Sequence, residues 1–174
     1  MTKIPIFIAI VFLFAAAGLA QGTCTRHTEP SGKFSYCPPA GWEPRDPKSG
    51  TFKIFVTPTG ATFRANMNVK TETTDASHDR YMMAALQLLM KDNETKGDGA
   101  TKMVGWTEFL TDSRLRGSRV IYELLYQGVM LRTVQYIFDM PGGKLILTGT
   151  GMLANKDTTD KIFDGIAKSM RLER

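Results

Sequence analysis

The hydrophobic and polar positions of residues 116–152 alternate in the pattern of three antiparallel strands joined by two tight turns. The loop Gln127-Gly128 predicts the first turn, because glycine readily takes the positive φ that a two-residue hairpin needs. The register that results places these residues opposite one another: Leu124 and Leu131, Glu123 and Arg132, Tyr122 and Thr133. Both faces of this sheet are then largely apolar, so each face needs a cover.

Four other segments alternate with a period of two and are expected to be strands: 33–37, 51–57, 61–69 and 103–110. In the last of these, Val104 and Trp106 are expected to point inward, with Phe109 as a further candidate. Pro38 and Pro39 end the first strand because proline has no hydrogen-bond donor for a ladder. Residues 43–50 and 92–102 are rich in turn-forming and polar side chains and are expected to be loops.

The hydrophobic period changes to that of an amphipathic helix in two places. The first helix is capped by Asp75 or Ser77 and runs to about Lys91. The second covers residues 158–169, with Thr158 or Thr159 as its cap. Their apolar stripes are Tyr81, Met82, Ala85, Leu88 and Leu89 in the first, and Ile162, Phe163, Ile166, Ala167 and Met170 in the second.

Gly165 lies inside the second helix and costs about 1 kcal/mol relative to alanine there. We expect this glycine to allow a close approach of the helix to the sheet. Two helices for two apolar sheet faces predict an α+β fold: an α/β/α sandwich with a central antiparallel sheet covered by helices on both faces.

Residues 1–20 have the pattern of a secretory signal peptide, in which Lys3 precedes an apolar run over 6–17 and small residues precede a cleavage point at Gln21. The run is shorter than the ~20 residues of a membrane span, and no later segment is long and apolar enough to span. Residues 21–32 are expected to be a polar N-terminal arm and residues 33–174 a single domain. The mature chain is therefore expected to be secreted or periplasmic.

The two cysteines, Cys24 and Cys37, leave three interpretations open. A Cys24–Cys37 disulfide suits an exported protein and closes a loop of about 13 residues, worth about 3 kcal/mol in the chain-entropy model. Two free thiols are the second, and lipidation of Cys24 is the third, although Gln21 and Thr23 do not fit a lipoprotein signal. Two cysteines and two distant histidines make no zinc spacing.

The net charge of +5 is spread along the chain without a block of like charge. Such a surface favours solubility, acidic partners or anionic lipid headgroups. The aromatic residues alternate on strands, which is typical of a core rather than of a nucleic-acid platform. We therefore expect a protein partner and no nucleic acid.

No motif indicates catalysis. The GxGxxA of residues 149–154 lacks the βαβ unit of a dinucleotide site, and its glycines are better explained by a helix or Trp106 lying close to the strand. His27 and His78 are expected to be exposed. Four acidic residues around the first helix have no calcium-loop spacing, namely Glu72, Asp75, Asp79 and Asp92. We expect no catalytic residue, no cofactor and no metal; Asn93 is a glycosylation acceptor only in a eukaryotic host.

The stretch Phe34-Ser35-Tyr36-Cys37-Pro38-Pro39-Ala40-Gly41-Trp42 resembles the aromatic strand and Pro-Pro-x-Gly-Trp of the PsbP-like superfamily (PsbP and the Mog group). The strand 63–69 is similar to its Phe-x-x-Asn-Ile-x-Val strand. The order of the remaining elements is also similar: a hairpin, an aromatic strand, a Gly-Gly turn, an apolar strand, a helix and a short last strand at 170–172.

This resemblance implies a non-catalytic binding or assembly protein of membrane-associated complexes. We therefore expect an exported, monomeric accessory protein that contacts its partner through loops 43–50 and 92–102. A photosystem II extrinsic subunit is the alternative if the host is photosynthetic, and a secreted hydrolase or a small-ligand carrier are the others.

Trp42 is expected to pack on the sheet edge, so Trp42→Ala should lower the free energy of unfolding by about 3–5 kcal/mol. Thermal and denaturant unfolding of the two proteins measure the difference. An unchanged melting temperature would place the indole in solvent.

Overall fold

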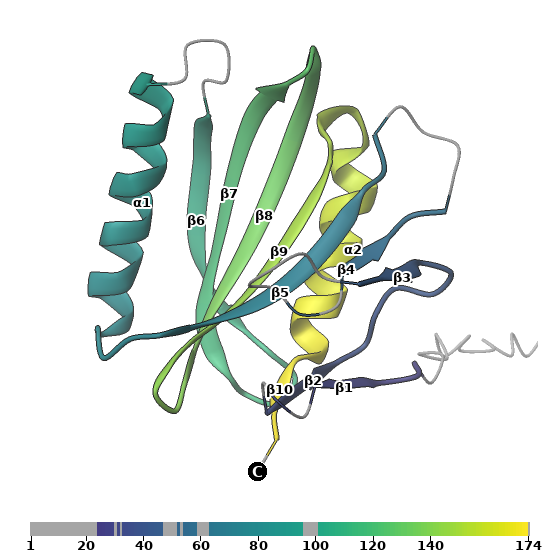
Figure 1. Ribbon diagram of the computed structural model, residues 1–174, viewed down its shortest axis with the longest axis vertical. Helices are drawn as coiled ribbons and strands as arrows, with labels where there is room; N and C mark the ends of the chain where they lie inside the picture. The colour runs from purple at the N-terminus through teal and green to yellow at the C-terminus, as the bar shows by residue number, and fades with distance from the viewer. Residues whose placement is uncertain are drawn as a thin grey trace, which may run out of the picture.

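The computed structural model describes residues 24–29, 31, 33–46, 52, 54–58, 63–95 and 101–173 (Figure 1). Its strands are β1 (His27–Glu29), β2 (Phe34–Tyr36), β3 (Glu43–Arg45), β4 (Ile54–Val56), β5 (Asn66–Thr73), β6 (Lys102–Leu110), β7 (Arg116–Tyr126), β8 (Val129–Met140), β9 (Gly143–Met152) and β10 (Arg171–Leu172). Its helices are α1 (His78–Thr95) and α2 (Lys156–Ser169), the second preceded by a 3₁₀ turn, Leu153–Asn155.

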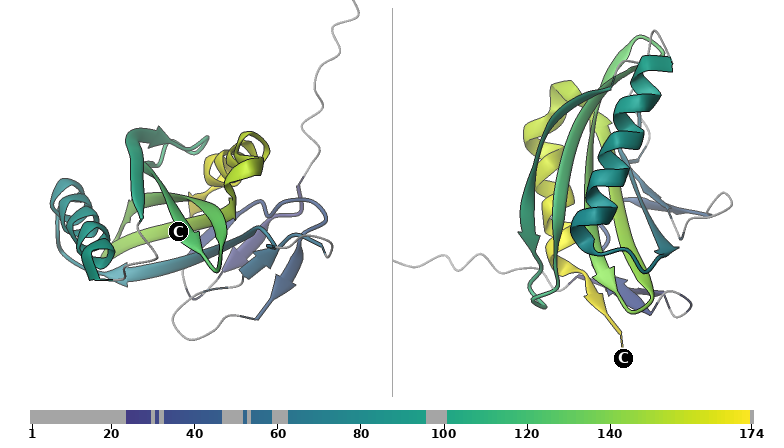
Figure 2. Two further views of the ribbon diagram at one scale, coloured as in Figure 1. Left: turned by 90° about the horizontal axis from the view of Figure 1, so that it is seen from above. Right: turned by 90° about the vertical axis from the view of Figure 1, so that its left-hand side faces the viewer.

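These strands form two antiparallel sheets. The large sheet has the order β3-β4-β5-β9-β8-β7-β6, and the small sheet has the order β1-β2-β10. The two helices lie on either side of the large sheet (Figure 2), and we name its two surfaces the α1 face and the α2 face. The predicted sandwich, with an antiparallel sheet between two helices, is confirmed. Among the described residues, no helix combines the length and the apolar character needed to cross a bilayer.

The central hairpin has the predicted register. Glu123 lies opposite Arg132 across β7 and β8, and the two side chains form an ion pair of 2.9 Å. Gln127 and Gly128 both have positive φ, at 49° and 77°, as a two-residue turn that matches the strand twist requires. The positive φ at both positions therefore fixes which side chains face each helix.

The α2 face carries the main core. Strand side chains from β5, β8 and β9 meet Phe163, Ile166 and Ala167 of α2, and all of them are buried. A Cβ at Gly149 would overlap the ring of Phe163, so this glycine lets α2 lie directly on β9. The small residues of the GxGxxA stretch therefore serve helix packing, as expected. Gly165, in contrast, is exposed with open space around it, so its predicted role in close approach was wrong.

Ion pairs also hold α2 to the sheet. Arg119 of β7 donates to Asp164 at 2.7 Å, and Arg132 of β8 donates to Asp160 at 2.9 Å. The hydroxyl of Tyr136 also donates to Asp164. Burial, together with this bond, raises the pKa of Tyr136. Because a guanidinium group binds a carboxylate in a defined geometry, these ion pairs help to fix the orientation of α2 on the sheet.

The small sheet ties together segments that are distant in the sequence. Ser35 at the centre of β2 lies opposite Arg171 of β10, and β1 pairs on the other side of β2. Part of the segment expected to be an arm is thus a strand. Cys24 and Cys37 form a disulfide with their Cα atoms 5.7 Å apart. His27 packs edge-on against Tyr36 of this sheet and Phe55 of β4, so its predicted exposure was wrong.

Two predictions for the strands were wrong. Trp106 is 55% exposed rather than inward, and Val104 is exposed as well. β6 has a bulge between Met103 and Gly105, and beyond it Trp106 lies opposite Val120 on the α1 face; Phe109, on the other face, is the one that packs against the main core. Within the expected loop 43–50, Glu43–Arg45 form edge strand β3, and residues 47–50 lie outside the described part of the chain.

The helix ends also differ from the predictions. Ser77 is the cap of α1, since the Arg80 N–H donates to its Oγ at 3.4 Å, but α1 continues to Thr95. The side chain of Asn93 lies outside the described residues. In α2 the N-cap residue is Asn155, and Thr159 instead donates back to the Asn155 carbonyl at 3.1 Å.

Trp42 directly precedes edge strand β3 and also contacts helix α2. Its ring packs edge-on against Phe163 of α2, with ring centroids 6.1 Å apart, and the side chain is half-buried. The loss of unfolding free energy in Trp42→Ala therefore includes the lost contact with α2.

We expect Gly149→Ala to destabilise the protein by about 1–3 kcal/mol, because the new methyl group must displace Phe163. Denaturant unfolding measures the change. Gly165→Ala is the matched control on the solvent side of α2 and should stabilise by up to about 1 kcal/mol. Equal effects of the two substitutions would contradict the close contact at Gly149.

Candidate functional site

The α1 face is covered unevenly. Met82 in the first half of α1 is buried against Val120, Ile137 and Ile146. Further along the helix, Leu88 is 68% exposed. The first turns of α1 therefore hold the sheet, while its second half leaves hydrophobic surface in solvent.

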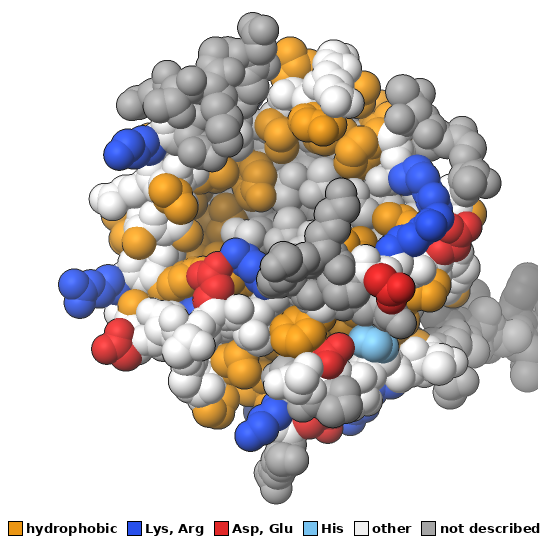
Figure 3. Space-filling model, viewed as in Figure 1, with side chains coloured by type: hydrophobic (Ala, Val, Ile, Leu, Met, Phe, Trp, Pro, Cys, Tyr) orange, Lys and Arg blue, Asp and Glu red, His pale blue; other side chains and the backbone are white. Residues whose placement is uncertain are grey.

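A hollow of about 370 Å³ lies between α1 and the sheet, and we call it the α1 groove. Figure 3 shows hydrophobic side chains along α1 and within this hollow. Its lining residues come from β5, α1, β7, β8 and β9: Lys70, Glu72, Tyr81, Met82, Ala84, Ala85, Leu86, Leu88, Leu89, Val120, Tyr122, Gln135, Ile137 and Ile146. The helix wall is apolar, and the sheet floor mixes apolar and polar side chains.

The polar part of the sheet surface is internally paired. Gln135 donates to the Thr148 hydroxyl at 3.2 Å, and the hydroxyls of Thr133 and Thr150 lie 3.2 Å apart. Burial raises the pKa of Tyr122 beside them. Because these groups satisfy one another, the floor tolerates incomplete cover by the helix.

Charged groups form one rim of the α1 groove. Glu72 accepts hydrogen bonds from Lys70 and from the Tyr81 hydroxyl. Burial acts to raise the pKa of Glu72, but these bonds outweigh it and the pKa is lowered. Burial and the bond to Glu72 raise the pKa of Tyr81. Lys144 lies over the Tyr81 ring, 5.8 Å from its centroid.

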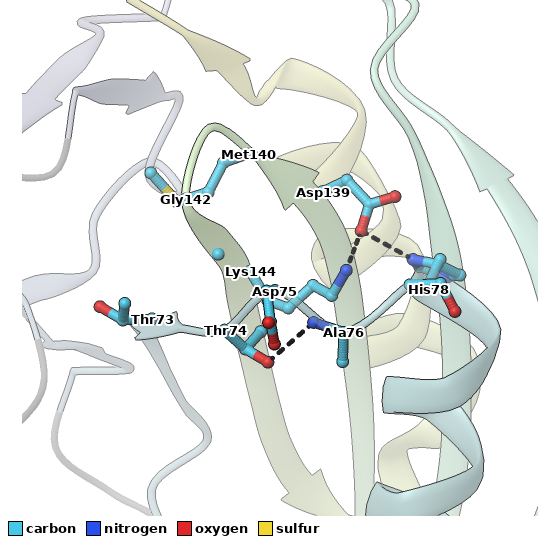
Figure 4. A pocket seen from close by; sticks show the side chains of 11 residues that line it. Thr73, Thr74, Asp75, Ala76, His78, Asp139, Met140, Gly142 and Lys144 are labelled. Atoms are coloured by element: carbon cyan, nitrogen blue, oxygen red, sulfur yellow. Dashed lines mark hydrogen bonds and ion pairs between the residues drawn. The ribbon is translucent and has the colours of Figure 1, made fainter.

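A second cluster fixes the start of α1 to the sheet. His78 Nε2 lies 2.7 Å from Ser118 Oγ of β7, and His78 Nδ1 lies 3.3 Å from Asp139 Oδ1 of β8. Lys144 of β9 also donates to Asp139. Figure 4 shows His78 and Lys144 converging on Asp139 beside a hollow of about 620 Å³. We call these four residues the His78 clamp.

The connectivity of the His78 clamp is that of a Ser-His-Asp triad, but its burial is the reverse. In a hydrolase the acid is buried and the serine faces the substrate. Here Ser118 is 2% exposed and the Asp139 side chain is 55% exposed. The arrangement therefore suits a structural latch for α1 better than an attack on a substrate.

The clamp corrects the expectation that His78 is exposed, since its side chain is 22% exposed and hydrogen-bonded. Its partners lie 40 and 61 residues away, so no local motif could have revealed them. Within the clamp, only the contact between Asp139 and Lys144 is local in the sequence. They pair across the turn between β8 and β9, where the predicted hairpins place opposite charges face to face.

The other sequence candidates are not brought together. Among the described residues, no three His, Cys, Asp or Glu side chains are placed to hold a metal ion. Glu72 is bound to Lys70 and Tyr81, and Asp139 rather than Asp79 is the partner of His78. The side chain of Asp92 lies outside the described residues. The disulfide of Cys24 and Cys37 lies at the small sheet, away from the α1 groove.

Comparison with solved structures gives strong matches over most of the chain. Cyanobacterial PsbP (CyanoP) from Synechocystis sp. PCC 6803 matches with a TM-score of 0.68 and 15% identity, covering 92% of this chain and 98% of that one. The chain has the PsbP-like fold. The family resemblance of the sequence is thereby confirmed at the level of the fold.

Two further structures share the PsbP-like fold. A Pseudomonas aeruginosa protein of unknown function has a TM-score of 0.58 and 16% identity, over 86% of this chain and 96% of that one. LpqN of Mycobacterium tuberculosis is described as involved in cell envelope biogenesis. It has a TM-score of 0.59 and 11% identity, over 81% of this chain and 83% of that one. No family model and no curated protein sequence matches the chain. Identities this low support the fold alone.

Asp139→Asn tests the His78 clamp through its pH dependence. Burial acts to raise the pKa of Asp139, but the bonds from Lys144 and His78 outweigh it and lower the pKa. A carboxylate with a lowered folded-state pKa stabilises the fold above its unfolded pKa of about 4 and loses that contribution as pH falls through the lowered value. The wild type should therefore lose more stability than Asp139→Asn between about pH 5 and about pH 2.

Melting temperatures across that range measure the difference, with Asp112→Asn in the exposed turn after β6 as the control. Parallel acid profiles for wild type and Asp139→Asn would show that the clamp does not bear on stability.

Proposed function

We propose that this chain is an exported, non-catalytic binding or accessory protein of the PsbP-like type that docks onto a membrane-associated partner. The observation that carries the proposal is where large hydrophobic side chains are exposed. Among the described residues these are confined to α1, β6 and the tip of the β7–β8 hairpin: Met83, Leu88, Met90, Val104, Trp106, Leu110, Leu125, Tyr126 and Met130. We call this group of residues the apolar side; by register Leu125 and Met130 lie on the α2 face of the hairpin tip, and Trp106 and Leu110 lie on the α1 face.

The apolar side occupies one part of the molecule. In Figure 1, α1, β6 and the hairpin tip lie to the left and at the top, whereas β1, β2 and β3 lie to the lower right. Surfaces where large apolar side chains collect in this way commonly mark interaction sites. The small sheet and its disulfide lie at the opposite end.

Export is supported by two features. Residues 1–20 have the pattern of a signal peptide, which leaves the arm 21–32 and the domain 33–174 as the mature chain. The Cys24–Cys37 disulfide is of a kind that persists in oxidising compartments. The fold of LpqN, described as an envelope-biogenesis protein, is consistent with the same location.

A non-catalytic role is supported by the burial of Ser118 within the His78 clamp. A nucleophile with 2% exposure has no access to a substrate. The carboxylates on the α2 side are engaged in ion pairs with Arg119 and Arg132. The Ser-His-Asp arrangement and the carboxylates beside α2 are thus explained by structural contacts.

Charge introduced on the apolar side tests the docking function. The tagged, exported protein is cross-linked in intact cells and recovered from the membrane fraction. Leu125→Glu combined with Met130→Glu should reduce recovery of its partner about tenfold, equivalent to about 1.4 kcal/mol. Gly165→Glu places a carboxylate on the exposed side of α2 and should leave recovery unchanged. Failure of the wild-type protein to recover a reproducible partner would contradict docking.

The α1 groove favours a second function, the carriage of a small apolar ligand. Its volume of about 370 Å³ lies within the range of ligand sites, and its helix wall is apolar. Anilinonaphthalene sulfonate is a suitable apolar probe. Ala85→Trp fills the groove and should weaken probe binding about tenfold.

The matched control is Gln87→Trp, on the exposed side of the same helix and outside the groove lining. Binding is measured by fluorescence titration. Equal affinities for the two variants would place the probe elsewhere and remove the support for a carrier.

A further inference from the structure

The two edges of the large sheet are built differently. Edge strand β3 has three residues, contains Pro44, and carries the charged Glu43 and Arg45. These are the usual protections of an exposed edge, because proline and charge discourage the addition of another strand. The opposite edge strand, β6, has nine residues and no proline.

Within the part of the chain that the structure describes, β6 pairs only with β7. Its one irregularity is the bulge between Met103 and Gly105, so the pairing is regular from Gly105 to Leu110. A strand paired on one side leaves alternate backbone N–H and C=O groups pointing outward. The regular half of β6 is therefore able to accept a further strand.

Three side chains mark the α1 face of this stretch. Trp106, Glu108 and Leu110 lie opposite Val120, Ser118 and Arg116 of β7, at alternate positions of one register. Trp106 is 55% and Leu110 54% exposed, which is unusual for large apolar groups at an open edge. The pattern along the edge is apolar, acidic, apolar.

The acidic position argues against a second copy of this chain as the occupant. In an antiparallel pairing of two β6 strands that places Trp106 opposite Leu110 of the other copy, Glu108 meets its own counterpart. Like charges directly opposite one another are unfavourable. A foreign strand with a basic residue at this position meets Glu108 with opposite charge, and its flanking apolar residues cover Trp106 and Leu110.

We infer that β6 is a docking edge for an extended segment of a partner protein, with the pattern apolar-x-basic-x-apolar, which adds as a further antiparallel strand. This inference rests on the proposed docking function and names its contact. Backbone hydrogen bonds give the affinity, and the alternate side chains give the specificity.

A hollow beside β6 fits this mode of binding. It has a volume of about 490 Å³ and lies between the start of α1 and the edge strand, lined in part by Asp79, Trp106, Glu108 and Arg116. Asp79 and Glu108 are both exposed at this hollow. A basic side chain of the added strand opposite Glu108 faces this acidic hollow, and an adjacent apolar side chain covers the indole of Trp106.

Two blocked peptides test the inference: Thr-Val-Thr-Lys-Thr-Val-Thr, and the same peptide with Glu in place of Lys. Backbone amide chemical shifts of the whole mature protein report both the site and the affinity. The basic peptide should shift the amides of β6 and bind about tenfold more tightly than the acidic one. Glu108→Lys should reverse this preference.

Glu173→Lys makes the same charge change after β10 and should leave the preference as in the wild type. Equal binding of both peptides, or shifts confined to the α1 groove, would overturn the inference. A Trp106-dependent dimer in analytical ultracentrifugation would also overturn it, because a second copy would then occupy the edge.

Cross-linking in cells separates this inference from the docking function itself. If the wild type recovers a membrane partner and Trp106→Ala recovers it equally well, docking stands and the β6 edge is excluded. If the wild type recovers none, the docking function fails, whatever the peptides do.

Discussion

The contact of Phe163 with the bare backbone of Gly149 is the interaction on which the arrangement depends. Because Gly149 has no side chain, α2 lies directly on β9. This close packing brings Asp164 within hydrogen-bonding distance of Arg119 and Tyr136, so these contacts depend on it. The chain that leaves α2 is then placed to pair with β2 and complete the small sheet.

The same sheet presents a different problem on its other face. The α1 face is apolar where Val120, Ile137 and Ile146 lie, and polar where Gln135 and Thr148 bond to each other. Covering the apolar region buries hydrophobic surface and stabilises the fold, whereas covering the paired polar groups adds little stability. The His78 clamp and Met82 therefore attach only the start of α1, and the α1 groove and the exposed edge of β6 follow from this partial cover. The surfaces proposed for function are those that the packing leaves incomplete.

Much of the fold could be predicted because local rules agree with the tertiary structure. The turn at Gln127-Gly128 sets the hairpin register, and the helical stripes select the two covering elements. The failures have physical causes that a single sequence hides. Trp106 lies on the α1 face of edge strand β6, where it stays 55% exposed. Gly165 lies on the solvent side of α2, and the glycine in the close contact is Gly149 of β9. The His78 clamp joins residues from α1, β7, β8 and β9, so only the assembled sheet brings it together.

The pairing of β2 with β10 has a consequence for the order of events during synthesis. β2 lies near the start of the domain and its neighbour β10 near the end, so a nascent chain has no partner for that side of Phe34–Tyr36 until almost all residues have emerged. Closure of such a long loop is entropically slow. The small sheet is therefore completed only after the strands of the large sheet are all available for pairing.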